Sequence, residues 1–498
     1  MSAKSTPASQ ESTVSLRSLI GPLVAIIIGI FMVILDGTAV NVALPKLQEE
    51  FKLPNMSLVQ WTVIGYALAQ AAVIPLAGWL SDRFGAKRVF LISIGLFTAG
   101  SALCAFANSV DMLIAFRIVQ GIGGGVVVPI AMAFIYRLAP PDKVGAVMGM
   151  MGIPILLAPA LGPVLGGWFV EYYSWEWIFL VNLPIGVIGI VLGIRMLPNI
   201  ARQTVASFDI LGMILGPLAF AALVYGVSEG GIDPATGEST WTDTNTLAGL
   251  IIGGVALILF IIVELNRKNP LLELRVFGSG SFTKGIIVQW VSQIGLFGTM
   301  FMVPLFLQQA KGYSAFETGL IMLPQAVLSG LFMPIGGKLS DRFGARPLVL
   351  AGMLIATVSA YMLSNISASD GILSVMLPLA MLGAGMGLFM MPLNTHLMQS
   401  APQNLVGRVT SLTNATQQVV MSFAIAVLTT IMLTRMQDLA IAQQKPRPDL
   451  GIYADAFGHT FYILTFISIA GGLLGIILRK PKKPEGSQNE ADLHMMVG

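Results

Sequence analysis

The sequence predicts an all-α polytopic membrane protein with fourteen transmembrane helices. Its composition, its apolar runs and the placement of its positive charges support this prediction. Of 498 residues, 55% are hydrophobic and 11% are charged, whereas about 25% are charged in an ordinary soluble domain. The mean hydropathy is +0.80. So few polar side chains cannot cover a soluble surface, and we expect lipid to surround most of the chain.

Long apolar runs divide the chain into candidate spans. A helix of about 20 apolar residues crosses the hydrocarbon core of a bilayer. Fourteen such runs lie at 19–44, 57–80, 88–108, 111–136, 143–170, 175–197, 208–228, 246–265, 283–309, 316–337, 347–365, 371–394, 405–434 and 459–478. The polar start, 1–17, is expected to be a tail. The run that follows it is too long for a signal peptide and lacks a small-residue cleavage site, so it is the first span.

Positive charge is strongly asymmetric across these spans. Of 28 Lys and Arg residues, 21 fall in the tails and loops on one side, six fall on the other, and Arg117 lies inside a span. Loops rich in Lys and Arg stay in the cytoplasm. We therefore expect a multi-pass protein of the cell (inner) membrane with both termini in the cytoplasm.

The chain also contains an internal repeat. Leu80–Ala86 recurs letter for letter as Leu339–Ala345, 259 residues later, and a weaker echo relates 140–145 to 402–407. Repeats of the same orientation are typical of transporters built from two similar bundles. The offset exceeds the length of six spans, which indicates an insertion. The predicted parts are an N-terminal tail (1–18), a six-helix bundle (19–200), an inserted transmembrane hairpin (205–270), a second six-helix bundle (280–479) and a C-terminal tail (480–498).

The first copy of the repeat lies in a short loop that is dense in charge and glycine. Gly78 permits close packing of a helix end, and Gly85 permits a tight reversal. Asp82 suits the N-terminus of a neighbouring helix or pairing with nearby arginines. Such a loop either latches two bundles together or only sets the orientation of the chain. The candidate latch residues are Gly78, Asp82, Arg83, Gly85, Arg88, Asp341 and Arg342.

Two ionisable residues, Asp36 and Arg117, lie well inside predicted spans. A charge at the middle of a bilayer costs at least about 2.5–3.5 kcal/mol, so such residues are rare and usually functional. Asp36 precedes Pro45 by nine residues, and Arg117 follows Asp111 by six, which places them about 13 and 9 Å from the same face. We expect them to meet or to share a water-filled cavity. A carboxylate that alternates between burial and a cation carries protons; the alternative is a permanent ion pair that only ties helices together.

The fifth span is rich in glycine and proline. Glycines four residues apart give a smooth stripe for close helix contact, and prolines bend a helix. This pattern favours a flexible interface element over ordinary membrane packing. The residues concerned are Gly145, Gly149, Gly152, Pro154, Pro159, Gly162, Pro163, Gly166 and Gly167.

These segments resemble the major facilitator superfamily, specifically its fourteen-helix drug:proton antiporter branch. The loop Gly78–Arg88 resembles motif A of the superfamily, with a degenerate second copy at Gly337–Arg346. Arg117–Gly121 resembles motif B, whose arginine is implicated in proton transfer. The stretch from Gly152 to Gly167 resembles motif C, the antiporter motif, and Leu35–Pro45 resembles the acidic first-span motif of the branch. The resemblance covers nearly the whole chain.

The resemblance implies the major facilitator fold and a proton-coupled antiporter that exports amphipathic drugs or other small lipophilic or cationic compounds by alternating access. The alternative is a dedicated exporter of one endogenous metabolite or lipid. Spans 9 to 14 contain no acidic residue well inside the membrane. Neutral or singly charged compounds are therefore favoured over multiply charged cations as substrates.

Aromatic, amide and thioether side chains suit an adaptable substrate cavity, although any one of them is as readily explained by helix packing. The candidates are Trp61, Tyr66, Gln70, Gln289, Trp290, Gln293, Phe297, Gln325 and Met390.

The remaining side-chain chemistry argues against an enzyme. The three histidines are scattered, the one cysteine excludes an internal disulfide, and no nucleotide-binding loop is present. We expect no metal, no cofactor and no nucleic-acid partner. The expected partners are small-molecule substrates, protons and the lipid bilayer, with a periplasmic adaptor if the host has an outer membrane.

Overall fold

The computed structural model describes residues 16–53, 56–138, 144–199, 210–231, 238–267, 270–401, 405–444 and 449–478. Within these ranges the regular structure is helical. The first half contains α1 (Leu16–Glu50), α2 (Met56–Phe84), α3 (Ala86–Ala105), α4 (Val110–Leu138), α5 (Val144–Tyr172), α6 (Trp177–Leu180) and α7 (Asn182–Met196). Then come α8 (Ile210–Glu229), η1 (Thr240–Thr242), α9 (Thr244–Asn266) and η2 (Leu274–Gly278). The second half contains α10 (Gly280–Gln309), α11 (Ala315–Phe343), α12 (Ala345–Ser364), α13 (Ile372–Gln399), α14 (Val406–Ala442) and α15 (Leu450–Gly475).

These helices confirm the predicted all-α membrane class. In the described part of the chain, thirteen helical segments are long and apolar enough to cross a membrane, with α6 and α7 together forming one of them. The helix α5, 29 residues long, packs among them. Each of the fourteen predicted spans therefore has a helical counterpart.

The ends of several helices differ from the predicted ends. The helix α1 continues past residue 44 to Glu50, α14 continues past 434 to Ala442, and α15 begins at Leu450 instead of 459. Hydropathy marks the stretch that lies in hydrocarbon, whereas backbone hydrogen bonding continues into polar residues beyond it. The sixth span is interrupted near Leu180, because Pro184 has no N–H to donate to the carbonyl of that residue.

The two halves use the same helix pairings. In the first half, α1 packs on α5 and α7, α4 packs on α2 and α3, and α3 packs on α7. In the second half, α10 packs on α14 and α15, α13 packs on α11 and α12, and α12 packs on α15. Each pairing of the first half thus has its counterpart in the second, as a repeat of six helices requires.

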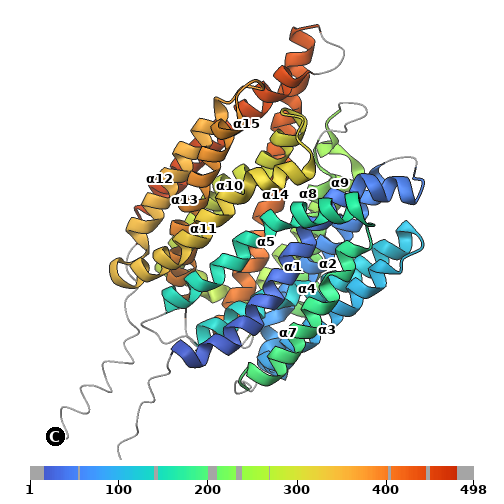
Figure 1. Ribbon diagram of the computed structural model, residues 1–498. Coiled ribbons are helices and arrows are strands. Elements are labelled where there is room, and N and C mark those ends of the chain that lie inside the picture. Colours follow the sequence, from blue (N-terminus) through green and yellow to red (C-terminus); the bar gives the residue numbers. More distant parts are fainter. Residues whose placement is uncertain are drawn as a thin grey trace, which may run out of the picture.

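Two helix pairs form most of the contact between the halves. The helix α5 packs along α11, and α14 packs along α2. In Figure 1, α5 and α14 lie between the group that contains α1 to α4 and α7 and the group that contains α10 to α13 and α15. The two joining pairs are equivalent under the repeat, since α5 corresponds to α14 and α2 to α11.

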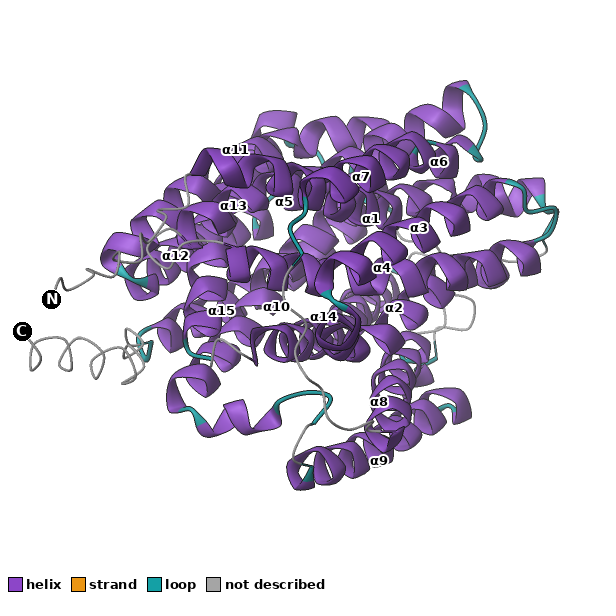
Figure 2. Ribbon diagram, turned by 90° about the horizontal axis from the view of Figure 1, so that it is seen from below, coloured by secondary structure: helices purple, strands orange, loops and turns teal. Residues whose placement is uncertain are grey.

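The hairpin of α8 and α9 lies at the edge of the molecule, beside α2 and α14 (Figure 2). The ring of Trp61 on α2 lies 5.9 Å from the ring of Tyr225 on α8. Trp241 in η1 donates to the hydroxyl of Thr430 on α14, at 3.2 Å. The hairpin therefore contacts one helix from each half. The predicted bounds of the bundles, the hairpin and the tails stay a prediction.

The repeated segment makes the same turn twice. One helix ends at Phe84 and the next begins at Ala86, with Gly85 at φ +90°. In the second copy the helices end and begin at Phe343 and Ala345, with Gly344 at φ +81°. Only glycine adopts such positive φ values readily, so the tight reversal expected at Gly85 is present in both copies.

Close backbone packing within the hairpin predicts a stability difference between two glycines of α9. A Cβ on Gly249 would lie 2.5 Å from the Cα of Gly226, whereas a Cβ on Gly254 meets nothing within 4 Å. Gly249→Ala should lower the free energy of unfolding by about 1–3 kcal/mol through overpacking. Gly254→Ala, the matched control, should be no less stable than wild type. Thermal unfolding of the purified full chain in detergent tests this, and equal melting temperatures for the two variants would contradict it.

Candidate functional site

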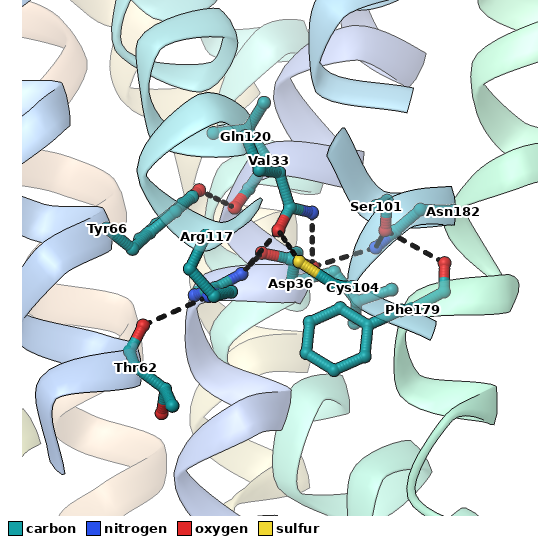
Figure 3. Close-up of polar contacts among 12 residues, drawn as sticks. Val33, Asp36, Thr62, Tyr66, Ser101, Cys104, Arg117, Gln120, Phe179 and Asn182 are labelled. Carbon is teal, nitrogen blue, oxygen red and sulfur yellow. Dashed lines mark hydrogen bonds and ion pairs between the residues drawn. The ribbon is translucent and has the colours of Figure 1, made fainter. Parts of the chain in front are cut away.

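Asp36 and Arg117 form a buried ion pair within the first half (Figure 3). Asp36 lies on α1 and is 1% exposed, and Arg117 lies on α4 and is fully buried. The Nη1 of Arg117 donates to Oδ2 of Asp36 at 2.5 Å. The two residues that the depth estimate placed near the same level of the membrane are thus in direct contact.

Two amides complete the surroundings of the Asp36 carboxylate. Gln120 donates to its Oδ1 at 2.9 Å and Asn182, at the start of α7, donates to the same oxygen at 2.8 Å. Gln120 also accepts from Arg117 at 2.8 Å. All three groups donate to Asp36, an arrangement that suits the ionised carboxylate, because an ionised carboxylate only accepts.

Arg117 is held by further contacts with α2 and α6. Its Nε donates to the carbonyl of Thr62 at 3.1 Å. Its guanidinium carbon lies 3.9 Å from the ring centre of Tyr66 and 5.7 Å from that of Phe179. Cation–π contact with desolvated rings stabilises a buried guanidinium. The pair therefore connects α1, α2, α4 and α6.

Glycines allow the backbones to approach at this point. A Cβ on Gly100 of α3 would lie 2.8 Å from the Cα of Gln120, and a Cβ on Gly121 of α4 would lie 2.6 Å from the carbonyl oxygen of Tyr66. A Cβ on Gly166 of α5 would lie 2.7 Å from the carbonyl oxygen of Ala39. Distances under 3 Å leave no room for a side chain, so these positions accept only glycine without movement of a helix.

A small cavity adjoins the carboxylate. It is lined by Leu35, Asp36, Ala39, Leu165, Gly166, Phe169, Ile178, Val181 and Asn182. Its size is at the lower limit for one water molecule. Two of its lining side chains, those of Asp36 and Asn182, are polar, so the cavity offers a water-sized space beside a titratable group within a membrane span.

The predicted fifth-span motif packs between the two halves. Gly162 and Gly166 face Thr38 and Ala39 on α1, where a Cβ on Gly162 would fall only 2.0 Å from the hydroxyl oxygen of Thr38. Gly167 faces the other way, toward Phe316 of α11. Pro163 lies between them and is half-buried. Gly152 is helical, but its surroundings lie outside the described part of the chain, as do those of Gly145, Gly149 and Pro154.

The first copy of the repeated loop contacts the other half through α14. Asp82 is 1% exposed and forms an ion pair with Arg408, whose Nε lies 3.5 Å from Oδ2. A Cβ on Gly78 would lie 2.8 Å from the carbonyl oxygen of Gly407. Asp82 thus meets the first turn of a neighbouring helix, as expected, but pairs there with an arginine that the sequence did not single out.

The other predicted latch residues are solvent- or lipid-facing. Arg83, Arg88, Asp341 and Arg342 are exposed. The guanidinium of Arg342 lies over the ring of Phe343, at 5.3 Å. The two copies of the repeat therefore share a backbone turn but differ in surroundings, since Asp82 is buried and Asp341 is not.

The three substrate candidates on α2 have different surroundings. Tyr66 belongs to the ion-pair network, where its hydroxyl donates to the carbonyl of Val33 at 3.4 Å. Trp61 packs against Tyr225 of the hairpin. Gln70 lies against α4, its Nε2 3.0 Å from the Cβ position of Gly124. The Tyr66 hydroxyl lies 3.2 Å from the same Cβ position of Gly124, so Tyr66 and Gln70 point to one place, whereas Trp61 points to the hairpin.

The candidates in the second half are largely buried. Gln289 donates to Asn394 at 3.0 Å, and Gln325 lies 3.7 Å from the sulfur of Met386. Gln289, Gln293 and Gln325 are each less than 5% exposed, and in each the amide oxygen has no hydrogen-bond partner among the described residues. Phe297 and Met390 pack in an apolar cluster that also contains side chains of the first half, and Trp290 is half-buried.

Three residues with clear contacts were not predicted from the sequence: Gln120, Asn182 and Arg408. Gln120 could have been predicted, because residues three apart on a helix share a face and Gln120 follows Arg117 by three. Asn182 carried only the weak signal of a lone amide in an apolar run. Arg408 gave no signal, because its importance comes from a partner on a distant helix.

Metal-binding clusters are not found in the described ranges, where no three His, Cys, Asp or Glu side chains come together. The single cysteine, Cys104, is buried as a free thiol beside Gln120.

Comparison with known proteins identifies the family. The sequence profile of the Major Facilitator Superfamily matches residues 26–425. The chain belongs to this superfamily. It is 36% identical over 400 residues to the multidrug resistance protein B homolog of Mycobacterium tuberculosis (strain ATCC 25618 / H37Rv), an alignment that covers 80% of this chain and 73% of the relative. It is 32% identical over 462 residues to the lincomycin resistance protein LmrB of Listeria monocytogenes, covering 92% and 96%.

Solved structures of the superfamily share the fold. The proton:xylose symporter XylE superposes with a TM-score of 0.63 at 14% identity, covering 94% of this chain and 97% of XylE. The human organic anion transporter MFSD10 gives a TM-score of 0.62 at 16% identity, covering 92% and 99%. The family match and the thirteen candidate spans of the described residues together make the chain a multi-pass membrane transporter of small molecules and not an enzyme, as predicted.

The buried pair predicts strong coupling between two substitutions. Arg117→Met leaves the buried Asp36 carboxylate without its cation and should lower the free energy of unfolding by about 3–5 kcal/mol. Adding Asp36→Asn removes the orphaned charge, so the double variant should regain part of the loss. A double-mutant cycle measures this coupling from the free energies of unfolding, in detergent, of wild type, the two single variants and the double variant. Exposed Arg195→Met is the control. Purely additive effects would mean that the pair contributes no interaction energy.

Proposed function

We propose that the chain is a proton-coupled antiporter that exports small amphipathic compounds by alternating access. The observation that carries the proposal is a titratable carboxylate, Asp36, buried in a transmembrane helix, paired with Arg117 and beside a water-sized cavity. Carboxylates buried in membrane spans are typical of proton relays. The relatives named for multidrug and lincomycin resistance support export as the direction of transport.

Coupling follows from the partners of Asp36. Protonation neutralises the carboxylate and weakens its bond to Arg117, so the energy that ties α1 to α4 depends on the proton. The helix α5 packs on α1 with one face and on α11 of the other half with the opposite face. A change at Asp36 is thereby transmitted to the contact between the halves. This arrangement supports a cycle in which proton uptake and substrate release occur on the same side.

Neutral or singly charged amphipathic compounds fit the second half best as substrates. In the described part of α10 to α15, the acidic residues Glu317, Asp341, Asp438 and Asp455 all lie within six residues of a helix end. No carboxylate there is placed to meet a second positive charge at mid-membrane. The same observation favours, as a second candidate function, the export of one uncharged endogenous metabolite or lipid.

The excess of Lys and Arg on the side of the termini supports a cytoplasmic location for both ends. In this orientation the ion pair of Asp82 and Arg408 lies at the cytoplasmic ends of α2 and α14. It would then act as a latch that closes the cytoplasmic side. A periplasmic adaptor is a further partner if the host has an outer membrane.

Removal of the titratable carboxylate tests the proposal. Asp36→Asn keeps the size of the side chain, but it removes the charge and one of the two acceptor oxygens, and it cannot exchange a proton. In energised cells, wild type should export a fluorescent amphipathic dye, an uncoupler should stop export, and Asp36→Asn should lose at least 90% of uphill efflux. The control is Asp455→Asn, which removes an exposed carboxylate of α15 and should leave efflux unchanged.

Each alternative gives a different result in this assay. Uphill efflux by Asp36→Asn at the wild-type rate would make the ion pair structural and would remove proton coupling at this residue. A wild type that exports none of a broad set of unrelated dyes would favour the dedicated-exporter candidate.

The latch is tested by the two copies of the repeat. Asp82→Asn leaves the buried guanidinium of Arg408 without a charged partner and should reduce dye efflux at least fivefold. Asp341→Asn is the matched control, because it changes the same letter in an exposed copy of the same turn. Its efflux should stay within twofold of wild type. Equal losses in both variants would assign the effect to the turn and not to the ion pair.

A further inference from the structure

Asn182 is a buried amide in direct contact with the carboxylate of Asp36. It is fully buried at the start of α7. Its Nδ2 donates both hydrogens, one to Oδ1 of Asp36 at 2.8 Å and one to the hydroxyl oxygen of Ser101 at 3.0 Å. Its own Oδ1 has no hydrogen-bond partner among the described residues. A buried acceptor without a partner is costly, so the amide is satisfied on one side only.

Protonation of Asp36 reverses what its neighbours must supply. The ionised carboxylate accepts from Arg117, Gln120 and Asn182, whereas the protonated acid has an O–H that needs an acceptor. The amide oxygen of Gln120 already accepts from Arg117. The uncommitted acceptor beside the carboxyl group is Oδ1 of Asn182.

A half-turn of the Asn182 amide exchanges these roles. Oδ1 then occupies the place of Nδ2, between Asp36 and Ser101, and accepts from the new carboxyl O–H. The hydroxyl of Ser101, which now donates to the carbonyl of Phe179 at 2.9 Å, turns to donate to the same oxygen. The two N–H groups of Asn182 turn away from Asp36, and a water molecule in the cavity that Asn182 lines would accept from them. One proton is gained by Asp36 and no other covalent bond changes.

We propose that Asn182 is a positioning residue that changes from hydrogen-bond donor to acceptor when Asp36 takes up a proton, and that the proton arrives through the cavity that these two residues line. The proposal rests on the proposed proton coupling at Asp36. The walls of the cavity come from α1, α5, α6 and α7. Since a Cβ on Gly166 would strike the backbone of Ala39, the glycine brings α5 close enough to form one wall.

Few other titratable groups face Asp36. They are Arg117 on α4, Tyr66 on α2 and Cys104 on α3, each of which interacts electrostatically with Asp36. The residues that line the cavity from α5, α6 and α7 are Leu165, Gly166, Phe169, Ile178, Val181 and Asn182, and none of them titrates. A change in pH dependence caused by Asn182 therefore acts through Asp36.

The test is pH-difference infrared spectroscopy of the full-length protein in lipid, combined with the pH profile of dye efflux. Wild type should show a carboxyl band and a side-chain amide band that appear together on acidification, and Asp36→Asn should lose both. Asn182→Leu, of similar volume but without hydrogen bonding, should lose the amide band and move the carboxyl band to higher wavenumber. Asn182→Leu removes a donor from the ionised form of Asp36 and the proposed acceptor from the protonated form, so the pH profile of efflux should differ from that of wild type.

Controls separate this proposal from a structural role. Exposed Asn266→Leu on α9 should change neither spectrum nor profile. Ser101→Ala, a milder change for use if Asn182→Leu does not fold, should move the carboxyl band in the same direction by a smaller amount. An unchanged carboxyl band and pH profile in Asn182→Leu or Ser101→Ala would overturn the switch while leaving the proposed function intact. Full uphill efflux by Asp36→Asn would instead overturn the proposed function.

Discussion

The need to neutralise one carboxylate in a lipid-surrounded bundle organises the first half of this protein. An ionised carboxylate is unstable in a medium of low dielectric unless a cation and hydrogen-bond donors surround it. Asp36 obtains one cation, Arg117, and two amides, Gln120 and Asn182, from α4 and α7. Three helices must therefore meet at one level of the membrane, which fixes their relative depth and rotation.

Glycine makes that meeting sterically feasible and connects it with the rest of the molecule. The stripe of Gly162 and Gly166 brings α5 against α1 one turn from Asp36, while Gly167 on the same helix faces α11. One helix therefore packs on the charged site with one face and on the other half with the opposite face. In a close-packed interior small displacements are passed on and not absorbed, so α5 is a mechanical connection between the surroundings of Asp36 and the other half.

The internal repeat shows how identical sequence acquires different roles. The two copies of the seven-residue segment form the same turn between helices, because Gly85 and Gly344 both adopt positive φ. Asp82 is nevertheless buried against Arg408 of α14, whereas Asp341 is exposed. Local geometry is set by the segment itself, and burial is set by the helix that packs on it.

The sequence by itself determined the membrane class, the positions of the spans, the repeated turn and the similar depth of Asp36 and Arg117. These properties follow from hydropathy, from glycine and from the fixed rise of a helix, each of which is local. Only the tertiary structure decided that Asn182 is a partner of Asp36 and Arg408 a partner of Asp82. It also decided that Tyr66 lies on the guanidinium of Arg117 and that α1 and α14 run beyond their apolar stretches. The physical reason is that the partner of a residue depends on which faces of distant helices meet. The hydropathy pattern gives the depth of a residue in the membrane, but it does not give the rotation of its helix about the helix axis.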